Sequence, residues 1–581
     1  MSRPRSGSNT KILAPLQADR LDGRGWDYSC DVLVIGWGAA GACAALEARS
    51  QGAEVIVADR FTGGGASAKS GGVVYAGGGT RQQQDAGFSD TPQAMFDYLK
   101  HETRGVISDD TLRKFCDDSA DNLRWLESHG ARYAHSLPPG GKTSYPADGY
   151  FLYYSGNELV PSHSGEHPAA PRGHRTVGKG QCGAVLYGHL QAACLRAGAQ
   201  PLLQSAARRL VVDDNGRVLG AELWRLPEGT REARVHARLA ARAERWQNFA
   251  PGYCDRLRQK ISRLERDHGQ PVLVRARRGV ILSTGGFIFN RDLIREHAPK
   301  FRRNFKVGAT GCDGSGLRLG QSVGGKSERL SRVSAWRFIN PPFCWPKGIV
   351  VNAQGQRFCN EEVYGATLGQ PLCEEQGGQA WLVLDARLRK QAIRQALFGG
   401  YWWFQSLPAL ALMLLRVRKG DNPDRLAQVC GMQSGELSSS LRGYNAAARG
   451  EVADPFGKSE GSRQVLDKGP FYACNISVDN PVFPLGALTL GGLKVDENTG
   501  AVLDDNSQPI AGLYSAGRTA IGVASHLYIS GLSLADCVFS GRRAGRASTA
   551  GSDLERDEPV AGQRASTGTS IQQGLQHEHT S

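Results

Sequence analysis

The stretch Gly36-Trp37-Gly38-Ala39-Ala40-Gly41 decides the fold of this chain. It follows an apolar run over residues 31–36, which predicts a strand, and it opens a helical pattern over residues 39–51. In such a turn the first glycine permits the tight bend, the second lets backbone N–H groups approach a pyrophosphate, and the third lets helix and strand pack closely. The helix N-terminus adds the positive end of its dipole. The pattern therefore predicts a dinucleotide-binding βαβ unit, and the alternative is a plain βαβ turn without a ligand.

The residues that follow strengthen this prediction. A second strand is predicted over residues 54–59 and ends in Asp59, about 20 residues beyond the glycine turn, where a carboxylate binds ribose hydroxyls. Further buried strands are predicted at residues 279–284 and 512–515. Short apolar runs that alternate with helical patterns are typical of the α/β class.

Composition limits the class of protein. The chain has 581 residues, enough for two domains, and a net charge of +14 that favours acidic ligands, nucleic acid or an anionic membrane. No stripe of basic and aromatic residues is present, so we expect no nucleic-acid partner. The thirteen cysteines contain no C-x-x-C pair, which predicts reduced thiols and no metal site. No stretch has the length of a membrane-spanning helix or the pattern of a signal peptide, so we expect a cytoplasmic protein.

Three further motifs narrow the cofactor. They are the glycine/serine loop over residues 63–72, Ser283-Thr284-Gly285-Gly286-Phe287, and Gly512-Leu513-Tyr514-Ser515-Ala516-Gly517-Arg518. Together with the first turn, and in this order, they resemble the FAD domain of the fumarate reductase/succinate dehydrogenase flavoprotein superfamily. The resemblance implies FAD, bound without a covalent link because covalent members use a histidine in the early loop and residues 62–72 contain none. The cofactor contacts that we expect are Gly36, Gly38, Ala39, Ala40, Gly41, Asp59, Arg60, Gly65, Ala66, Ser67, Ser70, Gly71, Gly72, Thr284, Gly285, Gly517, Arg518, Ser533 and Leu534.

The resemblance also implies the domain order. It predicts an α/β protein in which a Rossmann-type FAD-binding domain carries an inserted α+β capping domain, with the substrate between the two. We expect disordered tails at both ends of the chain and a helical hairpin inserted into the first part of the FAD-binding domain. The predicted boundaries are 1–26 for the first tail, 27–330 and 476–550 for the FAD-binding domain, 227–269 for the hairpin, 331–475 for the capping domain and 551–581 for the last tail.

Two substitutions argue against a fumarate reductase. Those enzymes need fixed cations for a small dicarboxylate, and their pattern has a histidine where this chain has Ala487 and a proton-donating arginine where it has Tyr528. A dicarboxylate would lose its hydration without gaining ionic partners. We therefore expect a different substrate.

The tyrosine instead resembles the 3-ketosteroid dehydrogenases of the same superfamily, and most closely the Δ4-(5α) type. Those enzymes have a Tyr-Ala-Ser-Gly stretch where this chain has Tyr528-Ile529-Ser530-Gly531, and a capping-domain tyrosine similar to Tyr364. Residues 70–80 and 169–174 are also similar. The chain departs from the pattern at His526-Leu527, where two glycines are expected, and these bulkier side chains could reshape the pocket.

The resemblance implies a mechanism. Tyr528 would act as the general base that removes a proton beside the ketone of a 3-ketosteroid, while hydride leaves the adjacent carbon for flavin N5. Ser530 and Tyr364 would supply hydrogen bonds or relay the proton, and the backbone N–H near Gly531 would stabilise the enolate. The alternatives are 1,2-desaturation, reduction of a non-steroid enone, and an FAD-bearing binding protein without activity. No Fe–S or haem pattern is present, so electrons would pass to an external acceptor such as a quinone.

Two segments have no role in this scheme. The hairpin over residues 227–269 is either a surface elaboration or a docking arm. Residues 396–416 are rich in aromatic and aliphatic side chains but are interrupted by Pro408, too short to span a bilayer. This second segment could be core, the wall of an apolar pocket, or a patch that rests on a membrane, so peripheral membrane contact is a further hypothesis.

Overall fold

The computed structural model describes residues 10–21 and 25–550. Its largest sheet follows the order β1-β8-β9-β10-β2-β3-β7, with β21 pairing β10 and β20 pairing β21. The strands of this sheet are β1 (Leu16–Gln17), β2 (Tyr28–Ile35), β3 (Val55–Ala58), β7 (Gln200–Leu202), β8 (Ser205–Val212), β9 (Val218–Arg225), β10 (Gln270–Leu282), β20 (Ala501–Leu503) and β21 (Pro509–Ser515).

The glycine turn lies at the carboxyl end of β2, an interior strand of this sheet. The parallel strands β2 and β3 are joined by α1 (Ala39–Ser50), as the pattern predicts. The neighbouring strands β10 and β21 also run parallel to β2, and Leu282 is level with both Ile35 and Ser515. Four parallel strands therefore end side by side, which is where α/β sheets bind ligands.

Small residues let α1 pack against α18 (Leu532–Ala550), the last described helix. A Cβ atom at Gly541 would lie 2.5 Å from the carbonyl oxygen of Ala40, and one at Gly545 would lie 2.5 Å from that of Ala44. The spacing of four residues on each helix places these contacts one turn apart. The last described helix thus packs against the helix that follows the glycine turn.

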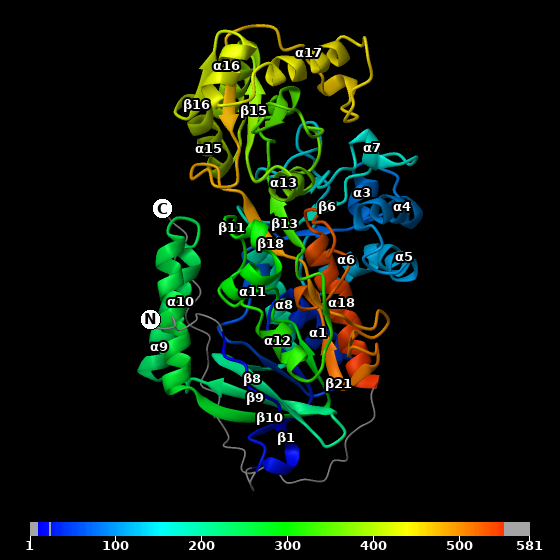
Figure 1. The fold of residues 1–581 in the computed structure, drawn as a ribbon. Helices are drawn as coiled ribbons and strands as arrows, with labels where there is room; N and C mark the ends of the chain where they lie inside the picture. Colours follow the sequence, from blue (N-terminus) through cyan, green and yellow to red (C-terminus); the bar gives the residue numbers. More distant parts are fainter. Residues whose placement is uncertain (1–9, 22–24, 551–581) are drawn as a thin grey trace, which may run out of the picture.

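A second group of strands lies beyond the carboxyl edge of the main sheet, at the top of Figure 1. It is a four-stranded antiparallel sheet with the order β14-β15-β17-β16. Its strands fall inside the residues predicted for the capping domain: β14 (Ile349–Asn352), β15 (Ala380–Leu384), β16 (Val417–Gly420) and β17 (Phe471–Asn475).

Three small sheets complete the strands. β18 pairs with β13 on one side and with β11 on the other. β13 belongs to the expected capping domain, whereas β11 and β18 belong to the two parts of the expected FAD-binding domain, so this sheet joins the two domains. The members are β4 (Val73–Tyr75), β5 (Leu152–Tyr153), β6 (Gly173–Arg175), β11 (Phe305–Lys306), β12 (Ser327–Glu328), β13 (Val333–Trp336), β18 (Gly486–Thr489) and β19 (Gly492–Leu493).

The remaining α-helices surround these sheets (Figure 1). They are α2 (Gly65–Ala68), α3 (Arg81–Asp85), α4 (Pro92–Thr103), α5 (Asp109–Asp117), α6 (Ser119–Ser128), α7 (Pro161–Ser164), α8 (Gly183–Arg196), α9 (Arg231–Trp246), α10 (Pro251–His268), α11 (Arg291–His297), α12 (Ser315–Ser322), α13 (Gly365–Glu374), α14 (Ala386–Phe398), α15 (Trp403–Leu414), α16 (Pro423–Cys430) and α17 (Glu436–Ala448).

The segment expected to be an inserted hairpin folds as α9 and α10, which pack against each other. It connects β9 to β10, and these strands are antiparallel with Arg225 opposite Gln270. The hairpin rises along one side of the molecule in Figure 1.

The N-terminal tail differs from the expectation of disorder over residues 1–26. Leu16 and Gln17 form β1, which pairs in parallel with β8, and Thr10 is buried with its N–H donated to Asp313 Oδ2 at 2.6 Å. The sequence did not predict these contacts, because the segment is polar and a strand of two residues is too short to show an alternating pattern. The other tail, residues 551–581, lies outside the described residues. No helix in the described ranges is long and apolar enough to cross a membrane.

Candidate active site

A cavity of about 780 Å³ opens at the carboxyl ends of β2, β3 and β10 and continues to the small sheet that contains β13. Most of the residues expected to bind the cofactor line it. These are Gly36, Gly38, Ala39, Ala40, Asp59, Arg60, Gly65, Ala66, Ser67, Ser70, Gly71, Thr284, Gly285, Gly517, Arg518, Ser533 and Leu534. Tyr364, Tyr528 and Ser530 line the same cavity.

Three predicted residues, Gly41, Gly72 and Gly531, are not among those that line the cavity. Each is a glycine because backbone lies against it. An added Cβ atom would lie 2.0 Å from Gly36 O at Gly41, 2.5 Å from the carbonyl carbon of Cys182 at Gly72, and 2.7 Å from Tyr75 N at Gly531. The structure therefore gives these three positions a packing role.

The glycine turn fits the phosphates of a dinucleotide. Gly36 has φ +101°, and a Cβ atom there would lie 2.6 Å from Ser283 O, so only glycine suits this position. Gly38 precedes α1 without a side-chain cap, and the first turn of the helix has no acidic residue. The Ala39 N–H donates to Ser67 Oγ at 3.0 Å. Such a helix N-terminus attracts an anion.

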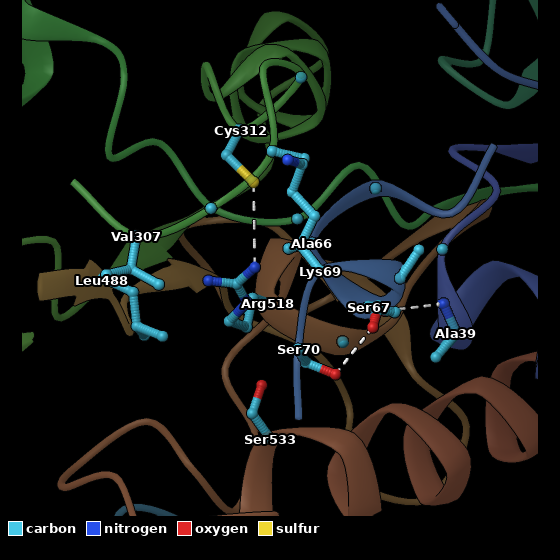
Figure 2. Close-up of a pocket in the computed structure, with 18 of the residues that line it drawn as sticks. Ala39, Ala66, Ser67, Lys69, Ser70, Val307, Cys312, Leu488, Arg518 and Ser533 are labelled. Atoms are coloured by element: carbon cyan, nitrogen blue, oxygen red, sulfur yellow. Dashed lines mark hydrogen bonds between the residues drawn. The ribbon is translucent and has the colours of Figure 1, made fainter. Parts of the chain in front are cut away.

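Figure 2 shows the side chains that gather around the early loop and Arg518. Ser67 and Ser70 lie on one side, and Arg518 reaches toward Cys312, whose Sγ lies 3.9 Å from Nη2. Val307 and Leu488 add an apolar surface beside the guanidinium. This part of the cavity thus combines the Arg518 guanidinium with apolar side chains.

Asp59 lies where the fingerprint places a ribose-binding carboxylate. Its oxygens accept the backbone N–H of Trp37 at 2.8 Å and of Phe61 at 2.7 Å. Burial raises the pKa of this carboxyl, and the two backbone donors act against that rise. Asp59 therefore holds the glycine turn and the following loop together at the wall of the cavity.

Tyr528 lines the cavity beside Trp336 of β13. Its ring contacts Trp336, with ring centroids 4.9 Å apart and planes inclined by 50°. Burial raises the pKa of the phenol, while the backbone of Gly531 and the charge of Arg518 act in the opposite direction. The phenolate is therefore costly unless donors and the cation support it.

Ser530 links two further tyrosines. Its Oγ lies 3.0 Å from the hydroxyl of Tyr153, and either oxygen can donate. Burial raises the pKa of Tyr364 well above its usual range, whereas a hydrogen bond with Ser530 lowers it. Ser530 therefore sits between Tyr153 and Tyr364 beside Tyr528. Sequence reasoning missed Tyr153, because β5 has only two residues and no motif marks it.

Tyr364 is held by a contact between distant segments. Its backbone N–H donates to Asn157 Oδ1 at 2.6 Å, and the amide of Asn157 donates to Thr367 Oγ1 at 3.0 Å and to Glu102 Oε1 at 2.9 Å. The ring of Tyr364 meets Phe338 edge to face, with centroids 5.4 Å apart. Both the backbone and the ring of Tyr364 are therefore fixed.

The rest of this end of the cavity is largely apolar. Its walls include Trp336, Phe338, Phe404 and Phe483, none of which the motifs identified. The indole Nε1 of Trp336 and the Oδ1 of Asn340 are buried and have no hydrogen-bond partner among the described residues. A flat apolar ligand with few polar groups fits such walls.

His526 and Leu527 are not among the residues that line the cavity, so they do not form the pocket wall themselves. Burial and three nearby arginines lower the pKa of His526 to about 4. The charged form of this imidazole is desolvated by burial and repelled by the arginines. Within the described ranges no cluster of histidine, cysteine or acidic side chains is arranged to hold a metal ion.

The mixed α/β fold, with a phosphate cradle and a long cavity at the carboxyl edge of its sheet, defines a dinucleotide-cofactor protein. The family model of the FAD binding domain matches residues 31–531. The chain belongs to this family, and FAD is its cofactor. The prediction of an FAD-dependent flavoprotein is therefore confirmed.

Comparison with individual proteins agrees with this assignment. The chain is 48% identical over 506 residues to the 3-oxo-5-alpha-steroid 4-dehydrogenase of Comamonas testosteroni, covering 85% of this chain and 93% of that protein. It is 26% identical to the 3-oxosteroid 1-dehydrogenase of Mycolicibacterium smegmatis, covering 86% and 93%.

A solved structure extends the similarity to the fold. The crystal structure of 3-ketosteroid-delta4-(5alpha)-dehydrogenase from Rhodococcus jostii RHA1, in complex with 4-androstene-3,17-dione, superposes with a TM-score of 0.77 at 27% identity. The match covers 92% of this chain and 100% of that chain. The expected resemblance to the Δ4-(5α) type of 3-ketosteroid dehydrogenase is therefore confirmed.

Proposed function

We propose that this flavoprotein desaturates ring A of a 3-ketosteroid, introducing a double bond between C4 and C5 of a 5α-3-ketosteroid. The observation that carries the proposal is that Tyr528, Tyr364 and Ser530 line one cavity whose walls are aromatic. The relatives named above for steroid 4-dehydrogenation support the same substrate class. A small dicarboxylate would gain little from these apolar walls.

The chain's own residues have a simple task in this reaction. The ketone acidifies the adjacent C–H, and the phenolate of Tyr528 takes that proton. Negative charge then grows on the ketone oxygen, where a backbone N–H near Gly531 was the expected donor. Gly531 itself does not line the cavity and its backbone contacts the phenol of Tyr528, so we propose that it supports the Tyr528 phenolate. The residues around the glycine turn and the early loop would hold FAD, which would supply the acceptor for the hydride that leaves the neighbouring carbon. Ser530 and Tyr153, 3.0 Å apart, offer a path for the proton away from Tyr528.

The first experiment is anaerobic bleaching of the purified yellow protein with a saturated 5α-3-ketosteroid, followed by identification of the product. Loss of flavin absorbance together with a 4-ene product is the expected result. A 1-ene product would assign the chain to the 1-dehydrogenases instead. If no 3-ketosteroid bleaches the flavin, the substrate class is wrong, and reoxidation of reduced flavin by non-steroid enones becomes the next assay.

We also propose how the chain is divided and how it holds FAD. Residues 27–330 and 476–550 would form a Rossmann-type FAD-binding domain, and residues 331–475 a capping domain that closes the substrate end. Because residues 62–72 contain no histidine, FAD would be non-covalent, and acid precipitation should release all yellow colour into the supernatant. The electrons would pass to an external acceptor such as a quinone, which rapid reoxidation by a soluble quinone analogue would test.

The last part of the proposal is contact with an anionic membrane through α15. Large apolar side chains are exposed on α15, at the end of the preceding α14 and just after α15, including Phe398 at 80% and Leu415 at 83% of their full accessible surface. We call this set the α15 patch; it consists of Leu397, Phe398, Trp403, Leu407, Leu414 and Leu415. The same helix contributes Phe404 and Gln405 to the cavity wall.

Charge and position favour a lipid surface as the partner of the α15 patch. Arg416, Arg418 and Lys419 follow the helix and are exposed, which suits anionic headgroups. Gln405 donates to Ser144 Oγ at 3.1 Å, which ties α15 to the loop beside the cavity. An apolar ketone dissolved in the bilayer would then enter near Phe404.

Vesicle co-sedimentation tests the membrane contact. The wild-type protein should sediment with phosphatidylglycerol vesicles at low salt, and Phe398→Asp or Leu415→Asp should reduce the bound fraction at least fivefold. Val452→Asp is the matched control, because Val452 is 53% exposed but lies outside the patch. Wild-type protein that stays in the supernatant with anionic vesicles would rule out the contact.

A further inference from the structure

The inserted hairpin lines the cavity beside the residues that follow β3. The residues of α9 that line the cavity are His236, Ala237, Ala240, Ala241 and Glu244. The same cavity is lined by Asp59, Arg60 and Phe61, which directly follow β3. In the dinucleotide-binding fingerprint the carboxylate after the second strand marks the ribose of the adenosine. The hairpin therefore covers the adenosine end of the FAD cavity.

A buried cluster of charges fixes the base of the hairpin there. Glu265 of α10 accepts Arg60 Nε at 2.7 Å and pairs with Arg208 of β8 at 3.3 Å. Arg60 also pairs with Asp313 at 3.0 Å, and His236 Nε2 lies 3.0 Å from Glu265 Oε1. Burial would raise the pKa of Glu265, but the charge of Arg60, assisted by His236, lowers it to about 2. Glu265 is thus charged and attached to the residue next to Asp59.

The far end of α9 is attached to the early glycine loop. Glu244 pairs with Lys69 Nζ at 2.6 Å, and Lys69 directly follows α2. The backbone N–H of Thr310 also donates to Glu244. At the near end the Gln204 amide donates to the carbonyl of Ala233 at 2.8 Å. The helix is therefore attached on both sides of the cavity.

The walls at this end have the shape needed for a planar group. Ala237, Ala240 and Ala241 present only methyl groups from α9, and the cavity is also lined by Ala206 and Ala207 of β8. The ring of Phe61 stacks on His236 with centroids 5.5 Å apart and planes 17° apart. Small apolar walls and an aromatic pair are suited to a flat, weakly polar base such as adenine.

We propose that the α9–α10 hairpin is a clasp for the adenosine part of FAD. In this clasp the alanines of α9 contact the adenine, and the ion pairs of Glu265 and Glu244 keep the helix closed across it. The hairpin is then neither a surface elaboration nor a docking arm, but a part of the cofactor site. The proposal depends on FAD as the cofactor and is independent of the steroid.

Binding of FAD to the apoprotein provides the first test. Ala237→Leu, which narrows the proposed adenine site, and Glu265→Gln, which removes the charge, should each raise the Kd for FAD at least tenfold. Arg238→Leu is the matched control, because Arg238 is an exposed residue of α9 that does not line the cavity, and its Kd should stay within twofold of wild type. Unchanged FAD affinity in both Ala237→Leu and Glu265→Gln would overturn the proposal.

Hydrogen exchange of the wild-type apoprotein locates the effect without any substitution. ADP should slow exchange at the α9 amides, whereas FMN, which lacks the adenosine, should leave them unchanged. Slowing by FMN and not by ADP would place the hairpin at the flavin end and contradict the clasp. A failed steroid assay leaves both experiments unaffected, so the two proposals can fail separately.

A variant without the hairpin completes the test. Because Arg225 and Gln270 are paired across β9 and β10, a two-residue Asn-Gly turn can replace residues 226–269. This protein should lose FAD during gel filtration. Its circular dichroism spectrum should lose only the helical signal that α9 and α10 contribute. Retention of FAD with wild-type affinity would exclude a clasp. If the shortened chain does not fold, the FAD affinities of the point variants and the hydrogen-exchange experiment still test whether the hairpin is a clasp.

Discussion

A tyrosine is an unusual base because its phenol normally titrates near pH 10. In this cavity burial raises the pKa of Tyr528 further, so its phenolate depends on nearby donors and on Arg518. The hydroxyls of Ser530 and Tyr153, 3.0 Å apart, lie in the same small region. The proposed chemistry therefore depends on four side chains that act together: Tyr528, Arg518, Ser530 and Tyr153. Removing any one of them should change the contribution of the other three.

Replacing the proposed base gives the most direct test at this scale. Tyr528→Phe keeps the contact with Trp336 but removes the hydroxyl, so flavin reduction by the steroid should slow by roughly 10²–10⁴-fold. The flavin spectrum and the Kd for FAD should not change. Stopped-flow absorbance measures the rate. Tyr401→Phe is the control, because that tyrosine contacts Phe343 outside the cavity, and equal rates in the two variants would remove Tyr528 from the chemistry.

Among the elements, α1 shows how a helix is matched to its sheet. Its third residue, Gly41, has no room for a side chain, since an added Cβ atom would lie 2.0 Å from Gly36 O. Glycine is required at this position because helix and turn approach each other closely. Its backbone angles are ones that other residues also adopt. The same contact fixes the position of the phosphate cradle.

Two glycine-to-alanine variants separate this contact from helix propensity. Gly41→Ala should lower the unfolding temperature and weaken FAD binding, because the helix must move away from the turn. Gly188→Ala, inside α8, meets nothing within 4 Å and should stabilise the protein by roughly 0.5–1 kcal/mol. Thermal unfolding followed by flavin fluorescence reports both effects. Similar shifts in the two variants would contradict the steric explanation.

The helix α18 contains a carboxyl group that opposes folding at neutral pH. Burial raises the pKa of Asp536 to about 6, while Arg543 and the Val523 N–H act against the rise. A raised pKa means that the folded protein binds the proton more tightly than the unfolded chain. Folded-state stability is therefore full below the usual value of 3.8 and falls as the pH rises from 3.8 to about 6.

Asp536→Asn should remove this dependence. At pH 7.5 the variant is expected to be more stable than wild type by roughly 1–3 kcal/mol, and at pH 4 the two should differ little. Urea unfolding at both pH values measures the difference. A variant that is less stable than wild type at pH 7.5 would show that the carboxylate contributes more through its bond to Val523 than it costs by burial.

For the whole molecule, sequence patterns predicted the parts that rest on backbone geometry. The glycine turn, Asp59 and the helical hairpin all follow from local sequence patterns, and the structure has them at these positions. Phe404 belongs to residues 396–416, for which the wall of an apolar pocket was one of the expected alternatives, and it does line the cavity. Trp336 and Phe483 were not predictable, because they come from separate elements and meet only after folding. The pairing of β13 with β18 was missed for the same reason.

Sequence reasoning also could not assign the hairpin. A charged helical segment has the same composition whether its charges face solvent or form a buried cluster such as Glu265 with Arg60. Only the fold brings Lys69 to Glu244 and Arg208 to Glu265. The roles that we give to individual residues of the cavity remain predictions for the experiments described above.

The contact between α1 and α18 makes a prediction for the intact chain. A chain that ends at residue 531 lacks α18, and the buried alanine face of α1 then has no partner. It should accumulate as insoluble protein without flavin. A chain that ends at residue 550 keeps every described element and should remain yellow and soluble. Fractionation of the two expressed proteins measures this, and a soluble, yellow short chain would contradict it.

The same contact has a consequence for synthesis in the cell. About 480 residues separate α1 from α18 in the sequence, and a ribosome needs roughly 25–100 s to make them. Throughout that interval the phosphate cradle exists in the nascent chain without the helix that covers it. We therefore expect the nascent chain to be prone to aggregation for most of its translation and to take up FAD once α18 has been made.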